Sequence, residues 1–360
     1  MVNLYLDTLV FGLQKIGGVS VVWYEYLTRM LKDSNINLTL LDINGEYINI
    51  NFKNLDTTTA CHIKEQGKSL QILRNRNPVF QVPKQTAIFQ STYLRVCKQK
   101  NVKNVVMIHD ITHQLYFKGI KKWLNTFQKK KAIYHADGIL CVSESTLNDL
   151  HKYFPETRNI KAEVVYNSAS TDYRVLDNPK FPNKYKILNG KKYVIYVGDR
   201  FPYKNTGFLN KILKERTDLF CVLIGGADFS IKEKRNMRGI QDRIIHFTGV
   251  SNQELNILYN NAFCMIFPSL YEGFGIPILE AMKTGCPVIA FHTSSIPELL
   301  QGTGYLLKVN DKKGCLKALR ELENKEIREQ VKAEELKAAE VFNWDNSYKK
   351  MVKFYEEILK

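Results

Sequence analysis

Short apolar runs alternate along the chain with longer segments in which apolar residues recur every three or four positions. The short runs are continuous rather than alternating, which is typical of strands in a parallel sheet that helices cover on both faces. They lie at 4–11, 105–110, 138–143, 162–167, 192–199, 220–226, 244–249, 264–269 and 286–291. So many buried strands, separated by helical segments, predict an α/β protein with two parallel-sheet domains rather than one.

The boundary between the domains is expected where the regular recurrence of apolar residues stops. Prolines, asparagines and lysines dominate the segment Asp177–Lys192, so we place the first domain at 1–178 and the second at 179–343. A chain of 360 residues is long enough for each domain to bury its own core. The last segment, 344–360, carries apolar residues at helical spacing. It could end the second domain or cross back onto the first, and we expect it to join the first.

Composition places the chain among ordinary globular proteins, with 44% hydrophobic and 24% charged residues. Its apolar runs fall well short of the roughly 20 residues that span a bilayer. The first residues, MVNLYLDTLVF, lack the basic stretch and apolar core of a secretion signal. We therefore expect a cytoplasmic protein. The seven cysteines are widely spaced and fit no metal-binding motif, so they are expected to be reduced and buried.

A net charge of +16 is the strongest compositional signal, and it favours a phosphate-rich ligand, an anionic membrane surface or nucleic acid. No aromatic-basic RNA motif is present and the charge is dispersed, so we expect no nucleic-acid partner. In the segment 118–131, lysines surround an apolar stripe: Lys118, Lys121, Lys122, Lys129, Lys130 and Lys131 around Ile120, Trp123, Leu124 and Phe127. This helix either lies on an anionic leaflet or packs its stripe on the core with the lysines in solvent.

The segment 264–291 holds the most specific motif. A strand at 264–269 leads through a Gly-Phe-Gly turn into a helix expected at about 277–284, because Pro277 suits a first helical position and Gly285 a left-handed C-terminal cap. Unpaired N–H groups at the start of such a helix form an anion site at the carboxyl end of a parallel strand.

Glu272 and Glu280 flank this turn. Carboxylates would repel a bare phosphate, but they suit hydrogen bonds from sugar hydroxyls. A ligand with sugars on both sides of a diphosphate would therefore satisfy every group. The alternative is that Glu280 only complements the helix dipole and that Glu272 is a solvated loop residue.

Residues 271–290, YEGFGIPILEAMKTGCPVIA, resemble the signature of family 4 glycosyltransferases, in which two glutamates eight residues apart flank a Gly-Phe-Gly turn. The resemblance implies the GT-B fold, with two Rossmann-like domains whose parallel sheets face each other across a cleft. It also implies a retaining hexosyltransferase that uses a nucleotide-diphosphate sugar and needs no metal or other cofactor. The sequence contains no Asp-x-Asp metal motif.

The resemblance assigns roles around this turn. It implies that Glu280 binds the ribose of the donor nucleotide and that Glu272 faces the transferred sugar as a catalytic residue. Backbone N–H groups are expected to contact the sugar or the diphosphate at Phe274, Gly275 and Ile276.

Upstream, the segment YVGDRFPYKN places Arg200 and Lys204 after a strand and at the start of the next helix. Two cations there suit a diphosphate leaving group, since a guanidinium binds it bidentately and an ammonium adds a point charge. A solvated basic loop is the alternative. The resemblance implies diphosphate binding by both, although Arg200 lies one position later than in many members. It further implies that backbone groups near Val250 hold the base, which leaves GDP-, UDP- and dTDP-sugars open.

The first domain contributes two further candidate sites. Gly17 and Gly18 end a loop before a helix, which either admits a ligand close to the backbone or allows tight packing. The resemblance implies that this loop faces the donor diphosphate. His109 and Asp110 end a strand, either as a base with its orienting carboxylate or as structural residues. The resemblance implies that His109 is catalytic and contacts the donor sugar at the reacting end.

The glycine-pair segment resembles the branch of the family that builds bacterial surface polysaccharides with mannose or deoxyhexoses. In the family, Asp110, Ser143 and Glu144 would line the cleft. We therefore predict transfer of a hexose or deoxyhexose to a glycan or lipid-linked acceptor, in the cytoplasm or peripherally on the inner face of the membrane. Ser168 stands where relatives usually have glycine, which leaves the sugar preference open. A GT-B epimerase or hydrolase is the nearest alternative, since two carboxylates and a histidine also serve those reactions.

Overall fold

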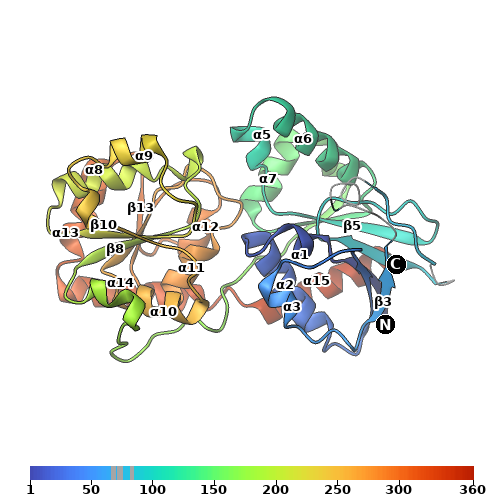
Figure 1. The fold of residues 1–360 in the computed structure, drawn as a ribbon. Helices are drawn as coiled ribbons and strands as arrows, with labels where there is room; N and C mark the ends of the chain where they lie inside the picture. Colours follow the sequence, from blue (N-terminus) through green and yellow to red (C-terminus); the bar gives the residue numbers. More distant parts are fainter. Residues whose placement is uncertain (66–69, 71–75, 82–84) are drawn as a thin grey trace. The chain divides into compact units, whose positions relative to one another are not determined.

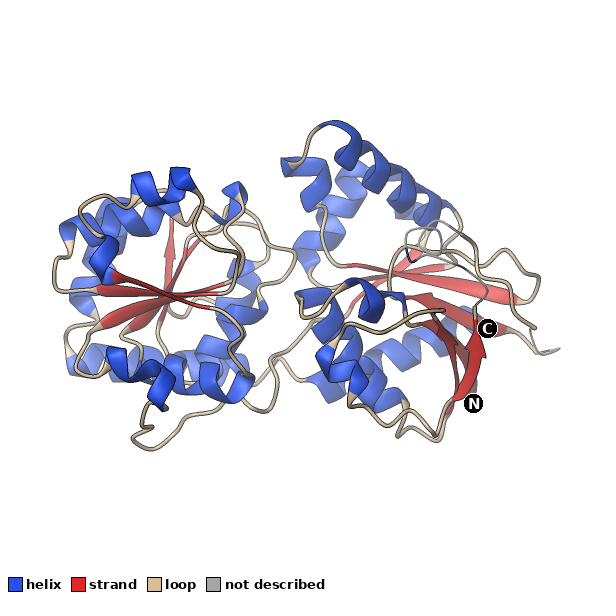
Figure 2. Ribbon diagram, viewed as in Figure 1, coloured by secondary structure: helices blue, strands red, loops and turns tan. Residues whose placement is uncertain are grey.

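The computed structural model describes residues 1–65, 70, 76–81 and 85–360, apart from the side chains of Ile120 and Lys121. The described residues form two compact units. Unit 1 comprises Met1–Asn167 and Asn343–Lys360, and unit 2 comprises Ser168–Phe342. In each unit, helices cover both faces of a parallel sheet (Figures 1 and 2), as the continuous apolar runs predict.

The sheet of unit 1 is parallel throughout the residues that the structure describes. Its seven described strands are β1 (Val2–Asp7), β2 (Ile36–Asp42), β3 (Cys61–Lys64), β4 (Ala87–Ser91), β5 (Val102–Ile108), β6 (Gly138–Cys141) and β7 (Lys161–Val164). Their order across the sheet is β3-β2-β1-β4-β5-β6-β7. The sequence patterns missed β2, β3 and β4. Strand β3 is largely exposed at the sheet edge, β2 contains Asn37 and Thr39 between its apolar residues, and β4 ends in Gln90 and Ser91, so none of the three is a continuous apolar run.

The first predicted strand, 4–11, was too long. It ends at Asp7, whose carboxylate accepts a hydrogen bond from the Leu9 N–H at 3.4 Å, and a short helix follows directly. The described helices of unit 1 are α1 (Leu9–Leu13), α2 (Gly18–Met30), α3 (Ile50–Lys53), α5 (Thr112–Tyr116), α6 (Gly119–Tyr134), α7 (Glu144–Tyr153), the 3₁₀ helix η1 (Pro155–Asn159) and α15 (Trp344–Leu359).

Helix α15 belongs to unit 1 although it follows unit 2 in the sequence. It packs on α2, β4 and β5, and the Tyr355 hydroxyl donates a hydrogen bond to the Gln90 side chain at 3.1 Å. The Phe354 ring lies so close to Gly138 that a Cβ there would approach it to 2.7 Å. The apolar face read from the sequence is therefore buried in the core of unit 1.

Unit 2, all of whose residues are described, contains a six-stranded parallel sheet. Its strands are β8 (Tyr193–Val197), β9 (Phe220–Ile224), β10 (Ile244–Phe247), β11 (Cys264–Phe267), β12 (Val288–Phe291) and β13 (Tyr305–Leu307), in the order β10-β9-β8-β11-β12-β13. Its helices are η2 (Asn183–Leu188), η3 (Pro202–Lys204), α8 (Gly207–Glu215), α9 (Ile231–Asn236), η4 (Gln241–Arg243), α10 (Asn252–Asn261), α11 (Ile276–Lys283), α12 (Ile296–Leu300), α13 (Lys312–Glu321) and α14 (Lys325–Ala339). The five strands predicted here are confirmed.

Both sheets reverse their strand order beside the first strand of the unit. In unit 1, β1 lies between β2 and β4, and in unit 2, β8 lies between β9 and β11. At such a reversal the loops diverge from the carboxyl ends of the two strands, and α/β proteins bind ligands there. In unit 2, the loops that follow β8 and β11 contain Lys204 and Glu272.

The predicted boundary at 178/179 is wrong by eleven residues, since unit 2 begins at Ser168. Residues 168–178 are held by the body of unit 2. The Arg174 N–H donates to the Asn256 side chain at 3.2 Å, and the Leu176 N–H donates to the Asn260 side chain at 2.8 Å. The tract rich in proline and lysine, 177–192, also belongs to unit 2: the Asn261 side chain donates to the Pro179 carbonyl at 3.1 Å, and Tyr185 and Leu188 are buried.

Across the described ranges, no helix combines the length and the apolar character needed to cross a membrane. Six cysteines are buried, as expected, but Cys61 is exposed on β3 at the edge of the sheet.

Candidate active site

The Gly-Phe-Gly turn after β11 requires its second glycine. Gly275 caps the N-terminus of α11 with φ of +111°, a conformation that L-residues rarely adopt. A Cβ on Gly275 would also approach the Leu299 side chain to 3.0 Å. The Ser295 hydroxyl fixes the turn by donating to the Phe274 carbonyl at 2.6 Å. The N–H group of Ile276 opens the helix and has no acceptor within it.

The helix bounds differ slightly from those expected. Helix α11 runs over Ile276–Lys283 rather than 277–284, so Pro277 is its second residue. Gly285 has φ of +67° and ends the helix in the left-handed conformation that the sequence predicts.

Lys204 and Glu272 form an ion pair at the carboxyl ends of β8 and β11. The Lys204 ammonium lies 2.8 Å from each oxygen of the Glu272 carboxylate, and the two side chains are only 16% and 11% exposed. The Glu272 N–H donates to the Ser294 hydroxyl at 2.8 Å, which fixes the backbone of the loop. Glu272 is therefore not a solvated loop residue, and an incoming diphosphate would compete with it for the ammonium.

Arg200 points away from this pair. Its Nε donates to the Glu233 carboxylate at 2.8 Å, Nη1 donates to the Gly225 carbonyl at 3.0 Å, and Nη2 donates to the Ala227 carbonyl. The guanidinium also lies over the Phe229 ring, 4.6 Å from its centroid. With 6% of its side chain exposed, Arg200 joins the loop after β8 to the loop after β9.

We propose that Arg200 positions the loop that carries Lys204 instead of binding the diphosphate. Arg200→Gln and Glu233→Gln should each lower the free energy of unfolding by about 1–3 kcal/mol, and the double variant should lose little more than either single one. Denaturant titrations measure this, and the dissociation constant of a nucleotide sugar should change less than about threefold. If Arg200→Gln weakened the donor more than tenfold while Glu233→Gln did not, Arg200 would instead be a diphosphate ligand.

Glu280 lies one turn further along α11, between two tyrosines. The Tyr259 hydroxyl donates to its carboxylate at 3.0 Å, and the Tyr173 hydroxyl is a second hydrogen-bond partner. Burial raises the pKa of Glu280 to about 7, although both hydroxyls act to lower it. No acidic residue occupies the first turn of α11, so a simple interaction of Glu280 with the helix dipole does not explain its position.

Val250 follows β10 at the same edge of the sheet. The next residue, Ser251, caps α10: its hydroxyl accepts from the Glu254 N–H at 3.2 Å, and its own N–H donates to the Glu254 carboxylate at 2.8 Å. The loop backbone at Val250 is therefore anchored to a helix. Unit 2 places Lys204, Glu272, Glu280 and Val250 on loops or helices that follow the carboxyl ends of its strands.

In unit 1, His109 and Asp110 follow β5 but do not form the expected base and carboxylate pair. The Asp110 carboxylate accepts from the Thr112 N–H at 3.1 Å. Within the described residues, His109 Nε2 is buried without a hydrogen-bond partner. Burial lowers the pKa of His109 to about 4, with Lys129 acting in the same direction and Asp110 opposing. The imidazole is therefore neutral near pH 7, and its buried Nε2 makes no hydrogen bond to the described residues.

Lys129 is a neighbour of His109 that the sequence patterns assigned to the surface. It is 4% exposed, and its ammonium donates to the Asp110 carbonyl at 2.6 Å and to the Gln114 side chain at 3.1 Å. Burial lowers the pKa of Lys129 to about 8. This lysine fixes the backbone that carries His109, and nothing in the surrounding lysine-rich sequence distinguishes it.

The glycine pair lies at the N-terminus of α2, after α1 rather than directly after a strand. A Cβ on Gly17 would meet the Gln14 side-chain oxygen at 2.6 Å, and that oxygen accepts from the Ser20 N–H at 3.1 Å. Packing therefore explains Gly17. Apart from the chain neighbours of Gly18 and the backbone of α2, no atom of the described residues lies within 4 Å of its Cβ position, so there is open space beside the backbone.

Ser143 and Glu144 begin α7 at the carboxyl end of β6. The Ser143 hydroxyl is buried and accepts from the Thr146 N–H at 3.0 Å as a helix cap. Glu144 is exposed in the first turn, where a carboxylate complements the helix dipole. In the part of the chain that the structure describes, no group of three or more His, Cys, Asp or Glu side chains could hold a metal ion.

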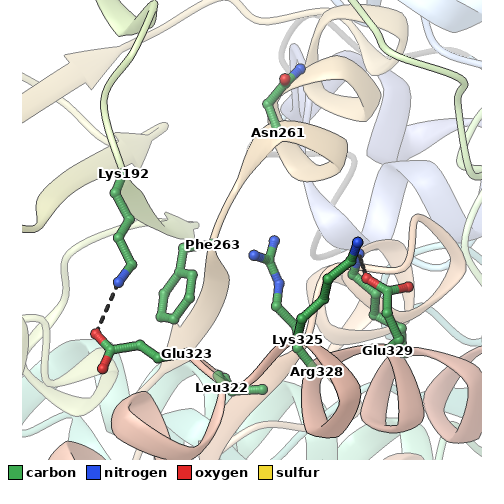
Figure 3. A pocket seen from close by; sticks show the side chains of 9 residues that line it. Lys192, Asn261, Phe263, Leu322, Glu323, Lys325, Arg328 and Glu329 are labelled. Atoms are coloured by element: carbon green, nitrogen blue, oxygen red, sulfur yellow. Dashed lines mark hydrogen bonds and ion pairs between the residues drawn. The ribbon is translucent and has the colours of Figure 1, made fainter.

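A separate pocket of about 520 Å³ lies at the opposite edge of the sheet of unit 2 (Figure 3). Lys192 and Phe263, which line it, directly precede β8 and β11. The Lys192 ammonium and the Arg328 guanidinium lie 4.2 and 5.1 Å from the centroid of the Phe263 ring, and Lys192 is paired with Glu323 at 3.0 Å. These cations are engaged in contacts within the unit, and the pocket is remote from the residues described above.

Comparison with known proteins identifies the fold and the class of protein. The sequence model of the family described as Glycosyltransferase Family 4 matches residues 85–173, and that of Glycosyl transferases group 1 matches residues 177–339. The structure of HepE from Anabaena, solved with UDP and glucose, superimposes with a TM-score of 0.72 at 15% identity and covers 99% of both chains. The fold is therefore GT-B, and each unit contains a segment that matches a glycosyltransferase family model.

Two curated relatives are O-antigen chain mannosyltransferases. RfbU of Salmonella typhimurium is 26% identical over 223 residues, and mannosyltransferase B of Escherichia coli is 30% identical over 236 residues. Each alignment covers 61% of this chain and 60% of the relative. The matched part thus spans less than two thirds of the length of these relatives.

Proposed function

We propose that this chain is a retaining glycosyltransferase. It would move a hexose or deoxyhexose from a nucleotide-diphosphate sugar to a glycan or lipid-linked acceptor in surface polysaccharide synthesis. The observation that carries the proposal is the pairing of Lys204 with Glu272, 2.8 Å apart at the sheet edge where α11 begins. The mannosyltransferase names of the relatives support a hexose donor, and the UDP and glucose bound to HepE support a nucleotide-sugar ligand.

The residues of unit 2 have complementary roles in this reaction. The leaving diphosphate is bound by the Lys204 ammonium and the N–H group of Ile276. Both groups are in place before negative charge develops on the diphosphate in the transition state. Glu272, released from Lys204, accepts a hydrogen bond from a hydroxyl of the transferred sugar. Glu280 accepts hydrogen bonds from the hydroxyls of the ribose, which lies on the other side of the diphosphate.

In unit 1, the neutral His109 imidazole would hydrogen bond to the transferred sugar through its unpartnered Nε2. Gly18 at the start of α2 would let the diphosphate approach the backbone. Because Lys204 and the helix N-terminus supply the positive charge, we propose that turnover needs no metal.

Donor binding and product analysis together test the proposal. Ligand-observed NMR with GDP-, UDP- and dTDP-sugars should identify one bound donor, and that donor should then glycosylate a synthetic alkyl mannoside with retention of configuration. Turnover should be the same with EDTA as without it. Equal consumption of the donor with and without acceptor would point to a hydrolase or epimerase, and failure of every donor to bind would reject the assignment.

We further propose that transfer to a lipid-linked acceptor takes place with the chain bound peripherally to the inner face of the membrane. The net charge of +16 favours an anionic surface. The exposed side chains of α6 in unit 1 are suited to this contact.

A further inference from the structure

Helix α6 exposes the apolar residues that a surface helix normally buries. The exposed fractions are 66% for Trp123, 45% for Leu124, 57% for Phe127 and 64% for Tyr134. Residues 123, 127 and 134 project from one side of a helix with 3.6 residues per turn, with residue 124 at its margin. Of the two alternatives left open by the sequence, packing of this stripe on the core is therefore wrong for Trp123, Leu124 and Phe127.

The buried side of α6 is partly polar, with polar residues beside the fully buried Ala132 and Ile133. Asn125, Gln128 and Lys129 are 9% exposed or less. The Gln114 side chain donates to the Asn125 and Thr126 side chains at 3.3 and 3.2 Å. These hydrogen bonds let polar groups face the domain, which leaves the apolar side free to face outward. The side chains of Ile120 and Lys121 lie outside the described residues.

The lysines around this face lack acidic partners. Among the ion pairs of the described residues, none includes Lys122, Lys130 or Lys131. Burial and the nearby cations Lys98 and Arg95 lower the pKa of Lys131. The helix itself contains no acidic residue, so the surface around the rings is cationic and uncompensated.

Two of the exposed rings of α6 form a single apolar surface. Trp123 and Phe127 stack with their centroids 5.8 Å apart and their planes inclined by 14°. Aromatic rings flanked by lysines match the boundary between lipid headgroups and acyl chains, where rings enter the apolar layer and ammonium groups meet phosphates.

We propose that α6 docks the chain on an anionic lipid bilayer, with Trp123 and Phe127 at the headgroup boundary and Lys122, Lys130 and Lys131 against lipid phosphates. Complementary charge favours a membrane over a second copy of this strongly basic chain. This inference rests on the proposed transfer to a lipid-linked acceptor.

Tryptophan fluorescence tests this contact directly. Trp23 and Trp344 are 0% and 3% exposed, so Trp123 is the tryptophan whose environment a surface contact changes. Vesicles of phosphatidylcholine with phosphatidylglycerol should shift the emission to shorter wavelength and protect Trp123 from aqueous iodide. Vesicles of phosphatidylcholine alone should do neither, and Trp123→Phe should abolish the response. Equal iodide quenching with and without anionic vesicles would overturn the proposal.

Cosedimentation of the full chain with the same vesicles separates the apolar and the electrostatic contributions. Trp123→Ala with Phe127→Ala should weaken binding at least tenfold, and Lys130→Gln with Lys131→Gln should do the same at low salt. The matched control is Lys349→Gln with Lys353→Gln on α15, which removes the same charge from exposed positions elsewhere. Losses of equal size in the control and in the α6 charge variant would overturn the assignment to α6.

Donor binding without vesicles keeps this inference distinct from the proposed function. The α6 variants should bind the nucleotide sugar as the parent does, so loss of vesicle binding with intact donor binding supports the docking surface. A parent chain that binds donor but no anionic vesicle overturns the docking surface and leaves the transferase assignment standing. A change in oligomeric state in the Trp123 and Phe127 variant, measured by light scattering, would identify the face as an interface between copies and overturn the membrane proposal.

Discussion

Replacing Lys204 by alanine is expected to lower kcat by about 10²- to 10³-fold, the usual loss when one positioned group that stabilises transition-state charge is removed. The KM for the donor should change much less, because the ammonium is shared with Glu272 at 2.8 Å before the donor arrives and gains most as the diphosphate leaves. Steady-state kinetics with the identified donor measure both constants.

Lys312→Ala is the matched control for this variant. Its ammonium also lies 2.8 Å from a glutamate, Glu215, but that pair is exposed and lies on other helices. It should leave kcat unchanged. Because Lys204→Ala leaves Glu272 without its cation, circular dichroism must first show that the variant is folded. A folded Lys204→Ala enzyme with kcat within threefold of the parent would contradict the role given to Lys204.

Replacing Glu280 by alanine is expected to weaken donor binding at least tenfold, since hydrogen bonds to a charged group are worth about 1.5–3 kcal/mol. The affinity of the parent should also depend on pH. With a pKa of about 7 in the free protein, Glu280 is mostly protonated at pH 6 and mostly ionised at pH 8. Ribose hydroxyls favour the ionised form, so the affinity should rise about tenfold over that range. Calorimetric titration with an intact nucleotide sugar measures it.

Glu280→Gln is the control for the pH dependence, because it keeps the shape of the side chain and cannot titrate. Its affinity profile should be flat between pH 6 and 8. The parent should also become less stable as pH rises from about 4.5 to 7, since the folded state retains a proton that the unfolded state loses. A parent affinity that is independent of pH, or a glutamine variant with the same slope, would contradict this account of Glu280.

The sequence predicts the strands that consist of apolar residues throughout. The strands β8, β9, β11 and β12 are largely buried, and each is a continuous apolar run. In unit 1, β3 is exposed at the edge and gives no such run. The boundary was placed too late because the composition changes only at Asp177–Lys192. Residues 168–178 are held to unit 2 by asparagine side chains of α10, which a local sequence pattern does not reveal.

The candidate site was predictable where one segment supplies several groups and not where partners come from distant segments. The segment with Glu272 and Glu280 carries its own turn and helix start. Arg200 was expected to bind the diphosphate, because its ion pair with Glu233 cannot be read from the local sequence. Glu233 lies 33 residues later, and the two come together only when β8 and β9 pair. The face that α6 buries was likewise not readable, since its polar partners, Gln114 among them, lie on another helix.

The return of α15 to unit 1 affects the order in which the units can fold during synthesis. Domains usually fold in the order in which they leave the ribosome. Here β4 and β5 gain their cover from residues 344–359 only after all of 168–342 has been made. Unit 2 is a continuous segment and can close its own core first. The unit whose synthesis begins first is therefore the last to be completed, and until then it has an unfilled apolar surface for chaperones to protect.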